Sequence, residues 1–182
     1  RHGLALSYAT GPRGACHTND PAYYAGSGVF IWPEFNITNY VTLQAKTSQG
    51  WSAVIKGSQD LGQIFNSGIL CYMVWVAINA EDLVDLMVAS SGFDYTLPEL
   101  TECGERIWHL KRGLNNLMGI TAKDDRLPQR ILTAATEGGA AGSVPDMKLL
   151  LGEFYPVRGL APDGRPTKET LARLGLNELS AK

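Results

Sequence analysis

The sequence predicts an all-α fold, an irregular multi-helix domain of 182 residues. Two observations favour this class. Several stretches combine a capping residue with apolar side chains at helical spacing, and neither a βαβ alternation nor a series of hairpins appears. Hydrophobic residues make up 45% of the chain, so there is enough apolar material for a core.

The first half of the chain has the less regular pattern. Apolar residues between 41 and 65 follow a helical period, which predicts a helix that is interrupted near Gly57. Residues 69–78 are nearly all apolar, and periodicity does not decide between a buried helical segment and a buried strand.

The middle of the chain contains two clear helix starts. Asn79 is expected to cap a helix that runs to Gly92, with Asp82 three residues after the cap. Thr96 and Glu99 form a second capping box, and the helix that follows is expected to reach about Gly119. The last third predicts a short helix from Leu127 through Leu132, a Gly/Ala-rich loop over 136–143, a helix from Asp146 to Gly159, a turn over 161–164 and a helix from Thr167 to Gly175.

The net charge and the cysteine content limit the classes of function that are expected for this chain. The formal net charge is -2, which provides no electrostatic reason to bind nucleic acid or an anionic membrane. The longest apolar stretch, 69–78, is too short to span a bilayer. Three widely spaced cysteines, Cys16, Cys71 and Cys103, do not form a disulfide pattern, so a reducing, cytoplasmic setting is expected. The abrupt start at Arg1 is typical of a piece of a longer chain.

A few residues have side chains suited to chemistry, and each also has a structural interpretation. His17 can serve as a general acid or base, or it can be a polar loop residue. Cys71 can be a small buried side chain or a thiolate ligand to an iron–sulfur centre, which would need further cysteines. Structural roles are expected for His2, His109, Cys103 and the polar loop at Asp124 and Asp125, where a carboxylate would cap a helix.

Four ordered motifs carry a resemblance to a known family. They are residues 3–17 (GLALSYATGPRGACH), 104–108 (GERIW), 121–130 (TAKDDRLPQR) and the pairs FY, RG, DG and PT with LGL between 154 and 176. Together the chain resembles the C-terminal portion of the tungsten-containing aldehyde:ferredoxin oxidoreductase family, whose third motif reads RKDDxLPxR. Ordered motifs over nearly the whole chain are far more specific than a lone pattern.

The resemblance implies a β-rich N-terminal domain followed by two mostly helical domains, with a bis-pterin tungsten (or molybdenum) centre between the domains and one [4Fe-4S] cluster. In the family, three cluster cysteines come from a CxxCxxxC run and the fourth from a DxxGLC segment that also binds a pterin. Residues 66–71 (NSGILC) fall at that place, so Cys71 matches the fourth ligand, and Asn66 and Leu70 match the pterin-binding positions. Asn66 stands where the family usually has Asp, and the glycine is displaced by one position.

The resemblance also implies a function for the whole protein, the oxidation of aldehydes to carboxylic acids with ferredoxin as electron acceptor. His17 would be the catalytic residue near the metal, and Cys16 is expected to pack. Residues 1–182 would form the C-terminal helical domain, inactive alone because the N-terminal pterin-binding and CxxCxxxC regions are absent. The expected partners are those N-terminal domains, ferredoxin and a small carbonyl substrate. Two alternatives stay open: a domain of a tungsten aromatic acyl-CoA ring reductase, and a non-catalytic helical interaction domain.

Overall fold

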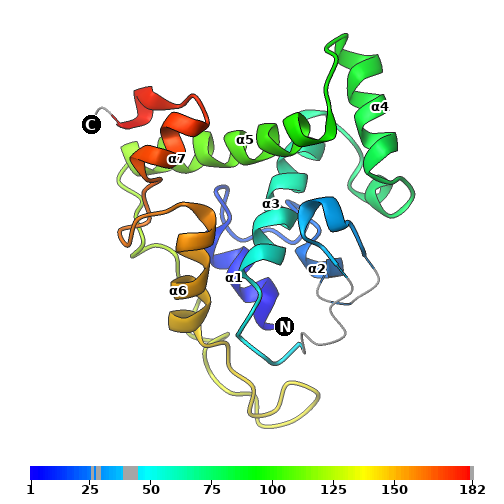
Figure 1. Cartoon of the computed structure of the whole chain (residues 1–182). Coiled ribbons are helices and arrows are strands. Elements are labelled where there is room, and N and C mark those ends of the chain that lie inside the picture. Colours follow the sequence, from blue (N-terminus) through cyan, green and yellow to red (C-terminus); the bar gives the residue numbers. More distant parts are fainter. Residues whose placement is uncertain (26, 28–29, 39–44, 181–182) are drawn as a thin grey trace.

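The computed structural model describes every residue except 26, 28–29, 39–44 and 181–182 (Figure 1). Within this described part, β-type pairing is limited to isolated β-bridges, which confirms the all-α prediction. The elements are, in chain order, α1 (His2–Thr10), α2 (Ala22–Ala25), the 3-10 helix η1 (Pro33–Phe35), α3 (Ser52–Ser67), the 3-10 helix η2 (Tyr72–Val76), α4 (Ala80–Ser91), α5 (Leu97–Leu117), α6 (Met147–Arg158), α7 (Lys168–Arg173) and the 3-10 helix η3 (Asn177–Ser180).

Helix α3 forms the centre of the molecule, with α1, α2, α5 and α6 packed against it. In Figure 1, α5 lies across α3 and α6 runs beside it. Two glycines allow the close approaches. A Cβ on Gly57 would lie 1.5 Å from the carbonyl oxygen of Phe35, and one on Gly104 would lie 2.4 Å from that of Asp60. The predicted interruption near Gly57 is therefore wrong: this glycine admits a neighbouring backbone, and the helix continues through it.

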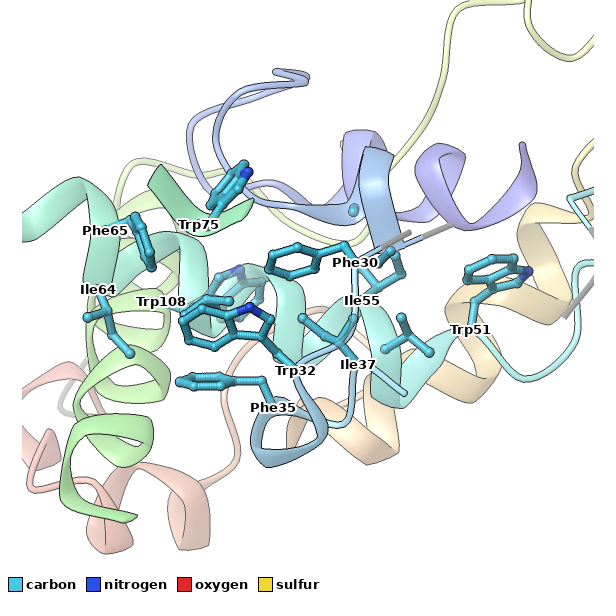
Figure 2. Packing of buried hydrophobic residues seen from close by; sticks show 14 of the residues in the cluster. Phe30, Trp32, Phe35, Ile37, Trp51, Ile55, Ile64, Phe65, Trp75 and Trp108 are labelled. Atoms are coloured by element: carbon cyan, nitrogen blue, oxygen red, sulfur yellow. The ribbon is translucent and has the colours of Figure 1, made fainter. Parts of the chain in front are cut away.

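An aromatic cluster fills the core between η1, α3 and η2 (Figure 2). Trp32 contacts Phe30, Phe35 and Phe65, with ring centroids 5.8 to 6.2 Å apart. Trp75 of η2 packs on Phe65 at 5.5 Å. Burial of such rings is the main apolar contribution to stability, and these contacts anchor η2 to the rest of the protein.

Four predicted helix starts are confirmed. Asn79 and Asp82 form a reciprocal capping box at α4, and Thr96 and Glu99 form another at α5. Side chains of Asp146 and Thr167 accept hydrogen bonds at the first turns of α6 and α7. Helix α4 stops at Gly92 and α6 at Gly159, both with positive φ, a conformation that glycine adopts without steric cost.

Two further expectations about helices fail. The helix predicted from residue 41 begins at Ser52, and positions 41–44 lie outside the described residues. Residues 127–132 form successive turns and no helix, with hydrogen bonds from the Ile131 and Leu132 amides three residues back.

The apolar run 69–78 is neither a buried helix nor a buried strand. It contains η2, whose Trp75 is buried while Ile69, Met73 and Val76 are exposed. Within the described ranges, no helix is both long enough and apolar enough to cross a bilayer.

Candidate functional site

His17 lies in the loop that connects α1 to α2, and its side chain is exposed. The loop turns at Gly11 and Gly14, where the Gly14 amide donates to the Gly11 carbonyl at 2.9 Å. On its outer side, Nδ2 of Asn115 in α5 donates to the Pro12 carbonyl at 2.7 Å. The loop is therefore held by a helix that lies about a hundred residues further along the chain.

Asp20 anchors the other end of this loop. Its carboxylate is buried and accepts hydrogen bonds from Ser7 Oγ and the Ala22 amide, both at 2.9 Å. Burial raises the pKa of this carboxyl to about 6, although the two hydrogen bonds act in the opposite direction. A carboxyl group fixed in this way holds α1, the loop and α2 together.

The loop also rests directly on α3. A Cβ on Gly62 would lie 2.3 Å from the Asn19 carbonyl oxygen, so only glycine allows this approach. Nδ2 of Asn66, one turn further along α3, donates to the same Asn19 carbonyl at 2.9 Å and to the Gly62 carbonyl at 2.6 Å. These contacts bring the His17 loop to the end of α3, five residues before Cys71.

Cys71 lies at the start of η2 with an exposed side chain. The chain leaves α3 through Gly68 and Ile69, and the amide of the half-buried Leu70 donates to the Phe65 carbonyl at 3.0 Å. No group of three or more His, Cys, Asp or Glu side chains in the described part of the chain is arranged to hold a metal ion. An exposed thiol fits the role of one ligand to a cluster whose other ligands come from a different segment.

Cys16 is half-buried in the His17 loop. Its Sγ lies 3.2 Å from Thr18 Oγ1 and accepts a hydrogen bond from the Arg13 guanidinium at 3.1 Å. The Thr18 hydroxyl and then the Arg13 guanidinium lower the pKa of this thiol to about 7, against the effect of burial. Cys103 is half-buried in α5.

A buried ionic cluster joins α3, α5, α6 and α7. Arg158 of α6 is fully buried, pairs with Asp60 of α3 and stacks 3.9 Å above the Trp108 ring. Glu105 binds Arg173 at 2.8 Å and Lys56 at 3.3 Å. Burial opposes its ionisation, but Arg173 and Lys56 prevail and lower the pKa of Glu105 to about 2.

Both histidines with an expected structural role are buried. His2 contacts Ser48 Oγ at 2.7 Å and Ser143 Oγ at 3.0 Å. His109 lies beside Trp108, and neither of its ring nitrogens has a hydrogen-bond partner in the described portion of the protein. Burial, followed by the charge of Arg158, lowers the pKa of His109 to about 3, so the ring is neutral at ordinary pH.

The KDD motif has a different role from the helix cap expected of it. Asp125 is buried and accepts two hydrogen bonds of 2.7 Å from Arg112 of α5 and one of 2.6 Å from the Tyr155 hydroxyl of α6. Asp124 accepts from the Thr121 amide and closes a turn. Asp125 thus ties the 121–128 loop to α5 and α6.

The chain is similar to known proteins over almost its whole length. A family model described as aldehyde ferredoxin oxidoreductase, domains 2 and 3, matches residues 1–176. The chain belongs to the aldehyde ferredoxin oxidoreductase family. It is 33% identical over 178 residues to the tungsten-containing aldehyde ferredoxin oxidoreductase of Pyrococcus furiosus and 32% identical to that of Pyrococcus horikoshii.

These alignments cover 97% of this chain but 28% of each relative. Further domains of the same protein are therefore implied. Within this chain, the structure gives physical reasons for two of the family motifs. Gly104 of GERIW allows the crossing of α3 and α5, and Trp108 packs on Phe154 of α6. Asp125 of KDD joins its loop to α5 and α6.

Sequence patterns missed Asp20 and Gly62, which position the His17 loop. A glycine inside a helical pattern signals a close backbone approach, and Gly62 was such a signal. The carbonyl that Gly62 admits belongs to a residue more than 40 positions away, so its partner was not readable from spacing.

Proposed function

We propose that residues 1–182 are the C-terminal helical domain of a tungsten-pterin, iron–sulfur oxidoreductase that oxidises aldehydes to carboxylic acids with ferredoxin as electron acceptor. Family membership supports the chemistry. One observation in the structure supports the site above all: Nδ2 of Asn66 donates to the Asn19 carbonyl. This hydrogen bond joins the His17 loop to the end of α3, just before Cys71. A proton-transfer group and a cluster ligand are thereby fixed to one helix.

His17 is the proposed catalytic residue. Its side chain is exposed, while the loop on either side of it is held by Asn115 and Asp20. A histidine in such a fixed loop can accept and release a proton at a ring nitrogen. The tungsten (or molybdenum) pterin group, when bound, supplies the two-electron oxidation of the carbonyl carbon.

Cys71 is the proposed cluster ligand, and Asn66 and Leu70 are the proposed pterin-contacting residues. Nδ2 of Asn66 donates to two backbone carbonyls, which leaves its Oδ1 as the atom that can accept a hydrogen bond from a pterin. An aspartate at this position could not make the two donor contacts. Leu70 keeps the segment in place by packing on the core.

The rest of the polypeptide would complete the site. It would supply the remaining cluster cysteines and the other pterin contacts, so the isolated chain is expected to be inactive. The proposed setting is cytoplasmic, with ferredoxin and a small carbonyl compound as partners.

The role of His17 is tested in the full-length protein by His17→Ala. We expect turnover with an aldehyde to fall by about 10²-fold or more, the usual scale for a general acid or base, with tungsten content unchanged. Unchanged turnover would remove His17 from the mechanism.

The role of Cys71 is tested by the iron content of the full-length Cys71→Ala variant. We expect the loss of about one cluster's worth of iron, about four atoms, because a ligand thiolate is removed. Cys103→Ala is the matched control and should retain its iron. A wild-type protein that binds neither iron nor tungsten would favour a non-catalytic interaction domain, and reduction of an aromatic acyl-CoA in place of aldehyde oxidation would favour a ring reductase.

A further inference from the structure

A cavity of about 350 Å³ lies between the last turns of α5, the loop before α7, α7 and η3. The chain after α6 folds back here, and Figure 1 shows α7 beside α5. Nε of Arg106 in α5 donates to the Leu174 carbonyl at the end of α7 at 2.9 Å. Gly113 lets Leu179 of η3 approach α5, since a Cβ there would lie 2.5 Å from Cδ1 of Leu179. The walls of the cavity are therefore held by contacts within the chain.

Leucine side chains form the apolar part of the lining. Leu171 of α7 is buried, Leu179 of η3 is half-buried and Leu117 of α5 is 47% exposed. Sites for small molecules are mostly apolar and contain a few polar groups that fix the orientation of the ligand. An apolar cavity of about 150 Å³ holds a benzene molecule. The larger volume here therefore suits a molecule with one ring and polar substituents.

The charged residues that line the cavity, Arg165 and Lys168, are both cations. Nη1 of Arg165 donates to Oδ2 of Asp163 at 2.8 Å, so one nearby carboxylate offsets part of the positive charge. Among the described residues, no carboxylate forms an ion pair with Lys168. Positive charge is thus left over beside the apolar lining, and this arrangement favours an anion that also has an apolar part.

Asn116 of α5 adds a buried polar group to the lining. Its side chain is buried, with a residue exposure of 9%, and Nδ2 donates to the Ile120 carbonyl at 2.8 Å. Oδ1 of Asn116 has no hydrogen-bond partner in the part of the chain that the structure describes. A buried acceptor without a donor is unfavourable, and buried polar groups are usually paired. A hydroxyl group on a bound molecule would supply the donor.

We propose that this cavity binds a small aromatic acid that carries a hydroxyl group. The carboxylate contacts Arg165 and Lys168, the ring packs on the leucine side chains, and the hydroxyl donates to Oδ1 of Asn116. This inference goes beyond the proposed function and does not depend on the roles of His17 and Cys71, because neither residue lines the cavity.

Calorimetric titration of the full-length protein with the meta and para isomers of hydroxybenzoate tests the site. We expect at least one isomer to bind with a Kd below about 1 mM, and weaker binding of both would overturn the proposal. Benzoate, which lacks the hydroxyl, should bind at least about threefold more weakly than the better isomer, because it leaves Oδ1 of Asn116 unpaired. A smaller difference would overturn the hydrogen bond to Asn116.

Two substitutions at exposed positions locate the bound probe. Lys168→Gln should weaken binding of the better isomer by about fivefold or more at low salt, with a smaller loss at high salt. Leu117→Asp places a negative charge on the lining and should weaken binding by about tenfold or more. The matched controls Lys148→Gln and Leu110→Asp change exposed residues outside the lining and should leave binding unchanged. Binding that neither lining variant weakens would overturn the proposal.

The full-length His17→Ala variant separates this inference from the proposed function. We expect it to bind the better hydroxybenzoate isomer as tightly as the wild type, whatever its turnover, because His17 does not line the cavity. Loss of binding in this variant would place the probe at the proposed catalytic site and overturn the inference. Unchanged turnover with unchanged binding would remove His17 from the mechanism and leave the cavity site supported.

Discussion

The centre of the molecule and its projecting part differ in the side chains that they bury and expose. At the centre, where α3, α5 and α6 meet, Arg158 and Asp60 are buried and paired. The projecting part consists of residues 69–95, with η2 and α4 (Figure 1). Its large apolar groups are exposed, and its exposed charges are acidic. The meeting point of the three helices is therefore held by a buried ion pair, whereas the projecting part leaves large apolar groups in contact with solvent.

Among the variants that test this comparison, removal of the central ion pair is expected to change the stability most. Arg158→Ala removes the buried one of the two cations that pair with Asp60, leaving only Lys56 at 2.9 Å, and it uncovers the Trp108 ring. We expect the free energy of unfolding, measured by urea denaturation, to fall by about 3 to 5 kcal/mol. Arg165→Ala, which breaks an exposed pair with Asp163, should change it by less than about 1 kcal/mol. Equal effects would show that the centre is not the more constrained region.

The helix crossing provides the next test. Gly104→Ala would place a Cβ 2.4 Å from the Asp60 carbonyl oxygen. We expect α3 and α5 to separate at a cost of about 1 to 3 kcal/mol in thermal or urea unfolding. Gly152→Ala on the exposed side of α6 meets no neighbouring atom and should stabilise the protein by about 0.5 to 1 kcal/mol. Destabilisation by both alanines would point to a cause other than the crossing.

The pH dependence of stability tests the interior around His109. Because burial lowers the pKa of His109 from its ordinary 6.5 to about 3, the unfolded chain takes up a proton in this range and the folded protein does not. Above pH 6.5, His109 is neutral in both states and does not lower the free energy of unfolding. As the pH falls from 6.5 toward 3, that free energy decreases by up to about 1.4 kcal/mol per pH unit.

His109→Leu should remove this component of the slope in urea titrations at several pH values. Glu105 and Asp20 also titrate in acid, with opposite signs, because the pKa of Glu105 is lowered and that of Asp20 is raised. Comparison of the variant with the wild type cancels their contributions. Identical slopes in the two proteins would mean that the His109 pKa is not lowered in the folded state.

The smallest expected effect is in the projecting part. Ile69→Gly removes the left-handed strain, while the extra freedom of glycine in the unfolded chain offsets part of the gain. We expect the stability of the 182-residue chain to rise by about 1 kcal/mol or less in urea denaturation. Met73→Gln, also exposed, should change it by less than about 0.5 kcal/mol. A loss above 1 kcal/mol in either variant would contradict the view that these side chains have no role within this chain.

Local signals predicted one part of the fold well and another part badly. The capping boxes at Asn79 and Thr96 involve residues three positions apart, so the sequence contains the whole interaction. The run 69–78 was expected to be buried because apolar residues usually are, yet part of it faces solvent. Helix α1 (HGLALSYAT) was not predicted, because small and apolar residues on several sides obscure its period.

The candidate site divides in the same way. The family resemblance pointed to His17 and Cys71, which are recognisable in short motifs. Patterns could not reveal that Asn66 holds the His17 loop, since its partner Asn19 lies 47 residues earlier. The pair of Arg158 and Asp60 is separated by 98 residues, and only the packing of α6 on α3 brings them together.

The amide of Asn66 also sets a chemical lifetime on the link between the His17 loop and α3. Asparagine is among the thermolabile residues, and hydrolysis of its amide gives aspartate. That product has no hydrogen to donate to the Asn19 and Gly62 carbonyls, and it would place a negative charge beside both oxygens. A single hydrolysis event in an ageing molecule would thus loosen the His17 loop while leaving the aromatic core intact.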